Sequence, residues 1–162
     1  MLTYAHTVEA PRREPSNGRP QPLESDNRLL DSIGSIEHEE HIFVLGWNGL
    51  DLMCALVRAG ATQVTHLLSH ERLEASSASL VIVPHVVSLD WLANALPSIR
   101  RALIPNGRLV VGVGAQPISR AQVRHMLSRH GLVMIRDGHA TDRQVVSAEV
   151  PAFGLRQAVW KL

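Results

Sequence analysis

Two short stretches of this chain carry residue types that could bind a ligand or do chemistry. Gly46-Trp47-Asn48-Gly49 follows the dense apolar run HIFVL, and His85 follows a second such run, SLVIV. Glycines in a turn let the backbone come close to a ligand, because no Cβ stands in the way. A histidine titrates near neutral pH and could act as a general base at the end of a strand. His85 is therefore the candidate catalytic residue, with a purely structural, hydrogen-bonded histidine as the alternative.

Other kinds of site find little support in the sequence. His66 and His70 are four residues apart but lie in a strand-to-loop context, and no Cys/His cluster has the spacing of a structural zinc site, so we expect no metal. The chain has neither the Gly-x-Ser-x-Gly elbow of hydrolases nor a P-loop. A dinucleotide fingerprint needs glycine at positions 46, 48 and 51, whereas Asn48 and Asp51 occupy the last two, which argues against NAD.

The elements that must position these residues follow from apolar periodicity. Short, dense apolar runs alternate with helical patterns, which predicts a mostly parallel sheet with helices on both faces. In such sheets ligands bind at the carboxyl ends of the strands, so any cofactor should lie over Gly46–Gly49, near Glu71 and His85. We expect strands at 41–45, 63–68, 79–83, 108–114, 132–136 and 155–162, and helices at 50–60, 88–104 and 119–131.

The helical patterns also predict which side chains are buried. Leu29, Ile33 and Ile36 share one helical face before the first strand. In the helix at 50–60, the expected inward residues are Leu50, Met53, Leu56 and Val57. Cys54, the only cysteine of the chain, lies in this apolar run, and we expect it to be a buried, inert thiol.

Length and composition suit one globular domain preceded by a tail. Within residues 1–22, the stretch APRREPSNGRPQP is rich in proline and arginine and almost free of apolar residues, which predicts a disordered tail over residues 1–22, or alternatively a basic arm that docks on a partner. Residues 23–162 are expected to form the single domain. A net charge of +1 gives no strong nucleic-acid signal. The sequence shows no secretory or membrane-spanning segment, so we expect a cytoplasmic protein.

The second half of the chain contains, in order, SLVIV, Pro84-His85, IRRAL, Pro105-Asn106-Gly107 and RLVVGV. These are an apolar strand, a polar residue at its tip, a helix ending in an Arg-Arg-Leu-like run, Pro-x-Gly, and another apolar strand. This order resembles the class I S-adenosylmethionine-dependent methyltransferases, which often show it. The resemblance covers roughly residues 41–162. It implies a Rossmann-like α/β fold with an antiparallel C-terminal strand. LVMIR and LRQAVWKL resemble the family's closing antiparallel hairpin, and the resemblance implies S-adenosylmethionine as the cofactor.

Several family features are missing. The first loop has two glycines instead of three and no preceding acid, and Trp47 could stack on an adenine, plug the site or pack in the core. The family's second strand ends in an acid that binds the ribose hydroxyls, and the nearest acid here, Glu71, comes two to three positions late. About eleven residues separate the second strand from SLVIV, too few for the family's third strand and its helices, so that strand is predicted to be missing.

Two functional hypotheses remain open after these observations. The chain is either a small methyltransferase with a trimmed cofactor site, whose acceptor the sequence does not identify, or a methyltransferase-like protein without catalysis that serves as a binding or structural partner. Loss of the third strand leaves QVTHLL as a free sheet edge, and the missing helices expose apolar surface. We therefore expect a homo-oligomer or a complex with a protein partner, the competing account being that the N-terminal helix around Leu29–Ile36 folds over this region.

Overall fold

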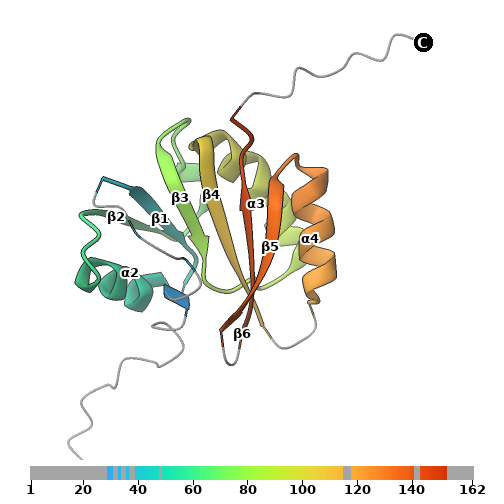
Figure 1. Cartoon of the computed structure of the whole chain (residues 1–162), viewed down its shortest axis with the longest axis horizontal. Coiled ribbons are helices and arrows are strands. Elements are labelled where there is room, and N and C mark those ends of the chain that lie inside the picture. Colours follow the sequence, from blue (N-terminus) through green and yellow to red (C-terminus); the bar gives the residue numbers. More distant parts are fainter. Residues whose placement is uncertain are drawn as a thin grey trace, which may run out of the picture.

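A computed structural model describes residues 29, 30, 33, 36, 39–47, 49–114, 118–140 and 143–152. The tail predicted over residues 1–22 lies outside these ranges. Strands and helices alternate through most of the described chain (Figure 1). In chain order they are β1 (His41–Leu45), α2 (Gly49–Arg58), β2 (Gln63–Leu67), a short 3₁₀ helix (His70–Arg72), β3 (Ala78–Val83), α3 (Leu89–Ala102), β4 (Leu103–Val113), α4 (Arg120–Arg129), β5 (Val133–Ala140) and β6 (Arg143–Glu149).

The described strands form one six-stranded sheet in the order β2-β1-β3-β4-β6-β5. The pairs β1–β2, β1–β3 and β3–β4 are parallel, whereas β6 is antiparallel to both β4 and β5. Residues 68–77, which connect β2 to β3, contain only the 3₁₀ helix, and β2 lies at the edge of the sheet. The predicted α/β fold is confirmed, including the mostly parallel sheet and the missing third strand.

Two layers of helix enclose the sheet, because its central strands alternate apolar side chains between both faces. On one face Ile42, Leu80 and Ile82 pack with α2 and with the helical residues Leu29 and Ile33. On the other face the neighbouring strand residues pack with α3 and α4. The buried residues of this second face include Leu45, Val81, Val83, Leu109, Val111, Leu92, Leu96, Val123 and Leu127.

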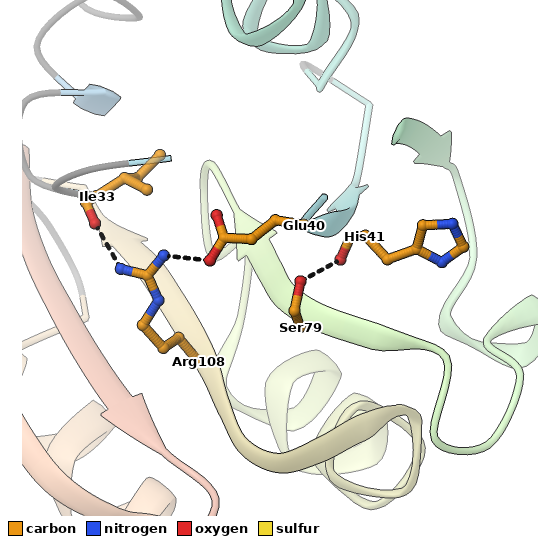
Figure 2. Close-up of polar contacts among 5 residues, drawn as sticks. All are labelled: Ile33, Glu40, His41, Ser79 and Arg108. Atoms are coloured by element: carbon orange, nitrogen blue, oxygen red, sulfur yellow. Dashed lines mark hydrogen bonds and ion pairs between the residues drawn. The ribbon is translucent and has the colours of Figure 1, made fainter. Parts of the chain in front are cut away.

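A single arginine on β4 fastens the chain that precedes β1. Arg108 donates from Nη1 to the carbonyl oxygen of Ile33 at 2.9 Å and from Nη2 to Oε1 of Glu40 at 2.7 Å (Figure 2). The hydroxyl of Ser79 donates to the carbonyl oxygen of His41 at 3.2 Å, which joins the start of β1 to β3. These contacts hold the N-terminal helical residues over the sheet, where Leu29 and Ile33 are buried as the sequence predicts.

The closing strand differs from the sequence-based expectation. The antiparallel strand is β6, Arg143–Glu149, whereas we expected it at 155–162, which lies outside the described residues. Val145 and Val146 point to opposite faces of the sheet and are both buried. Their neighbours Arg143, Gln144 and Ser147 are polar, so the segment lacks the dense apolar run that marks the other inner strands.

The inward face of α2 was predicted only in part. Leu56 is buried as expected and Met53 is half-buried, but Leu50 and Val57 are each 55% exposed, and Leu52 and Ala55 are buried instead. Cys54 is exposed and not buried as expected. Apolar residues occur nearly all around this helix, so periodicity did not identify which face meets the sheet.

None of the described helices is both long and apolar enough to cross a bilayer.

The Arg108 contacts predict a local effect on stability. Arg108→Ala should lower the free energy of unfolding by about 1–2 kcal/mol, because two charge-assisted hydrogen bonds are lost at a site that is partly screened by solvent. The backbone amides of Leu29, Leu30 and Ile33 should then exchange faster. Arg124→Ala is the control, because its ion pair with Asp137 is more exposed and should contribute about 0.5 kcal/mol. Equal losses from both variants would contradict this role of Arg108.

Candidate functional site

A pocket of about 310 Å³ lies at the carboxyl ends of β1, β2 and β3. Its described lining consists of Leu45, Gly46, Trp47, Leu68, Pro84, His85, Val87, Ser88 and Trp91. This is the edge where open parallel sheets bind ligands. The structure therefore brings the glycine turn and His85 together, as the strand pattern predicts.

Gly46 begins the turn between β1 and α2 and opens on to this pocket. Its φ angle is +110°, a backbone conformation that other residues rarely adopt, and an added Cβ would meet nothing within 4 Å. Its amide donates to the carbonyl oxygen of Leu67 at 2.9 Å. Glycine is thus required by the backbone conformation, and the space beside Gly46 is free. Asn48 lies outside the described residues.

Gly49 is not in the described lining of the pocket and has a packing role. A Cβ at this position would lie 2.8 Å from Nε2 of His66 and 2.8 Å from Cγ1 of Val44, so only glycine lets α2 begin this close to the sheet. His66 Nε2 lies 2.6 Å from the carbonyl oxygen of Gly46. Because a carbonyl oxygen only accepts, Nε2 carries the proton of this hydrogen bond. His66 therefore holds the glycine turn through this hydrogen bond.

His85 is an exposed side chain that follows β3 and lines the pocket. Two glycines of the neighbouring chain make room for this segment. A Cβ on Gly112 would overlap the carbonyl oxygen of Pro84, and a Cβ on Gly114 would lie 2.9 Å from Cε1 of His85. The amide of Val86 donates to the carbonyl oxygen of Gly112 at 3.1 Å. The position of His85 thus depends on close backbone contact between the end of β3 and the end of β4.

Two tryptophans line the pocket. Trp47, in the glycine turn, is 82% exposed, which excludes the core-packing alternative for this residue. Trp91 belongs to the first turn of α3, and its amide donates at 3.1 Å to the hydroxyl of Ser88, the residue that caps the helix. The rings of Trp91 and His70 meet edge to face, with centroids 6.2 Å apart. The pocket wall is therefore mainly apolar and aromatic.

The acid expected near the pocket is not in its described lining. Glu71 is exposed in the short 3₁₀ helix after β2, where the hydroxyl of Ser69 accepts a hydrogen bond from its amide. Leu68, the first residue after β2, lines the pocket instead. None of the described lining residues is acidic. Within the described chain, no three His, Cys, Asp or Glu side chains gather closely enough to hold a metal ion.

Sequence reasoning missed several residues of this region. Leu68 and Val87 gave no signal, because isolated apolar residues next to a strand are normally read as core. Ser88 and Trp91 could have been found from the helix start, since Ser88 is a favoured capping residue three positions before Trp91. His66 was noticed only as a metal ligand candidate, and its contact with Gly46 joins residues far apart in the sequence.

No protein-family model matches this chain, and no curated protein matches its sequence. Among solved structures, a SAM-dependent methyltransferase from Archaeoglobus fulgidus is similar with a TM-score of 0.67 at 9% identity, covering 81% of this chain and 95% of that one. A TehB-like SAM-dependent methyltransferase from Corynebacterium glutamicum has a TM-score of 0.57 at 15% identity, covering 80% and 88%.

A third similar structure is a 1,6-didemethyltoxoflavin-N1-methyltransferase from Burkholderia thailandensis, solved with bound 1,6-didemethyltoxoflavin and S-adenosylhomocysteine. It has a TM-score of 0.52 at 11% identity and covers 80% of this chain and 78% of its own. At such low identities the likeness concerns the fold alone. The chain has the class I SAM-dependent methyltransferase fold, as the resemblance in its second half implies.

The packing of Gly49 against His66 leads to a test of how the glycine turn is held. Gly49→Ala should lower the free energy of unfolding by about 1–3 kcal/mol, because its Cβ overlaps His66 and Val44. In a His66→Ala background the same change should cost at least about 1 kcal/mol less, since one of the two overlaps is gone. Urea denaturation of the four proteins measures this coupling. Additive effects would mean that Gly49 and His66 do not constrain each other.

Proposed function

We propose that this chain is a methyltransferase-fold protein that has lost cofactor-dependent catalysis and acts as a binding partner of another protein. The observation that carries the proposal is the pocket at the strand ends, whose described lining is apolar and aromatic and includes no acidic residue. The hypothesis of an active methyltransferase requires an acid at this place, because the resemblance assigns the binding of the ribose hydroxyls to the end of the second strand.

The residues present do not fit the ribose of the family's cofactor. Leu68 lies at the end of β2 and lines the pocket, while Glu71 is exposed and does not. Two ribose hydroxyls placed against Leu68 would lose water and gain no acceptor, and each unmade hydrogen bond costs about 1–3 kcal/mol. The open space at Gly46 is compatible with the cofactor, but it is also compatible with any ligand that needs close approach to the backbone.

An apolar group of a partner suits the pocket better. Trp47 and Val87 stand at its rim with most of their surface exposed, and Trp91 forms part of its wall. Aromatic residues around a small concave surface are typical of protein interfaces, where they bury a large area with few rotatable bonds. The pocket volume, about 310 Å³, is at the lower end of the range of roughly 300–1,000 Å³ for small-molecule sites.

Calorimetric titration with S-adenosylhomocysteine tests the loss of the cofactor site. The protein should show no saturable binding up to millimolar ligand. Leu68→Asp should introduce measurable binding, because a carboxylate at the end of β2 offers charge-assisted hydrogen bonds of about 1.5–3 kcal/mol, a gain of roughly tenfold or more.

Leu68→Asn is the matched control for this titration, since it has the same shape without the charge and should gain less. Micromolar binding by the unchanged protein, with no improvement in Leu68→Asp, would overturn the proposal and favour an active cofactor site.

Methyl transfer is the second candidate function. It is favoured by Gly46 and His85, which line the same pocket. Gly46 keeps the backbone conformation of a ligand-binding turn, and His85 lines the same pocket from the end of β3. The exposed imidazole of His85 could take a proton from the methyl acceptor. Under this hypothesis the acceptor enters over Val87 and Trp47, at the exposed rim.

His85→Ala separates this second candidate from the first. If methyl transfer occurs, turnover should fall by about a hundredfold to ten-thousandfold, the usual contribution of a general base, while S-adenosylhomocysteine affinity changes little. His85→Gln keeps a polar side chain without a basic nitrogen and should be equally impaired. Wild-type turnover in either variant would remove His85 from the mechanism.

A further inference from the structure

Helix α2 has two apolar faces, only one of which meets the sheet. Leu52, Ala55 and Leu56 are buried against β1 and β2. Leu50, Cys54 and Val57 recur at positions i, i+4 and i+7, so they form a second line on the side of the helix turned away from the core. All three are exposed. We call Leu50, Cys54 and Val57 the outer stripe.

Such a stripe is unusual because the exposed face of a surface helix is normally polar. Trp47 adds to it just before the helix begins and is 82% exposed. In the connection from β2 to β3, residues 68–77 contain only the 3₁₀ helix His70–Arg72, which contacts α3. The missing segment therefore leaves apolar surface without cover from this part of the chain, and large exposed apolar patches typically mark interaction sites.

The charges beside the outer stripe indicate what it binds. Asp51 and Arg58 are exposed, lie on the same flank of the stripe, and stand near opposite ends of α2. When two copies of α2 pack antiparallel about a two-fold axis near Cys54, Leu50 of each faces Val57 of the other. The same rotation brings Asp51 of each copy next to Arg58 of the other. The surface is therefore complementary to itself, because its apolar residues face apolar residues and its charged residues face opposite charges.

We propose that two copies of this chain form a symmetric dimer through antiparallel contact of their α2 outer stripes, flanked by two Asp51–Arg58 ion pairs. The proposal rests on the binding role proposed above and names the partner as a second copy. Trp47 enlarges the contact beyond the helix, which helps because specific interfaces bury about 800 Å² per partner. The free edge of β2 is a weaker alternative, since it is only five residues long and short edges resist pairing.

Charge reversal tests the dimer by sedimentation velocity at micromolar concentration, without any ligand. Asp51→Arg and Arg58→Asp should each weaken the dimer by about tenfold or more, because both symmetric ion pairs become repulsive. The double reversal should restore dimerisation. The helix dipole predicts that the double reversal makes α2 itself less stable, because it places a cation at the start of the helix and an anion at its end. Restored dimerisation therefore cannot come from a better helix.

Cross-linking gives a second, independent measurement. Cys54 is the only cysteine, so a short bismaleimide should produce a covalent dimer through it, and Cys54→Ser should produce none. A monomer with reactive Cys54, or a dimer that tolerates both single reversals, would overturn the proposal. A monomer with Cys54 protected would show that the chain covers its own stripe, which also overturns it. These outcomes leave the S-adenosylhomocysteine titration unaffected, so the two proposals fail separately.

Discussion

The burial of β3 on both faces is the constraint on which the rest of this structure depends. Leu80 and Ile82 pack towards α2, while Val81 and Val83 pack towards α3 and α4, and all four are fully buried. A strand buried in this way needs a paired strand on each side and a helical layer on each face, because its backbone and its side chains must both leave water. The end of this strand leads directly into Pro84 and His85, so the same burial fixes one wall of the pocket.

Backbone geometry and side-chain chemistry contribute separately to the pocket. The strand ends converge, Gly46 adopts a positive φ angle, and Gly112 and Gly114 allow the backbone after β3 to lie close to β4. The side chains that line the space include Trp47, Leu68 and Trp91, which favour apolar contact. The backbone thus sets the shape of the pocket, and these side chains set what it can contact.

The short connection after β2 has effects on both sides of the molecule. It places β2 at the sheet edge and leaves the α2 side of the sheet without a neighbouring helix from residues 68–77. Leu68, the first residue of this connection, is exposed and lines the pocket. The short connection thus supplies part of the pocket wall and contains no α-helix.

The sequence by itself determined the features that depend on local pattern and on chain length. Dense apolar runs identified β1, β2, β3 and β4, and the distance between β2 and β3 excluded a further strand. The helix expected at 119–131 is α4, which begins with a capping box in which both hydrogen bonds between Ser119 and Gln122 are present.

Only the tertiary structure decided which face of α2 is buried, where β6 lies, and that Gly49 packs on His66 while Glu71 stays outside the pocket lining. The physical reason is the same in each case. These outcomes depend on contacts between residues distant in the chain, and an apolar residue in α2 or a polar one in β6 has the same local pattern whichever partner it meets.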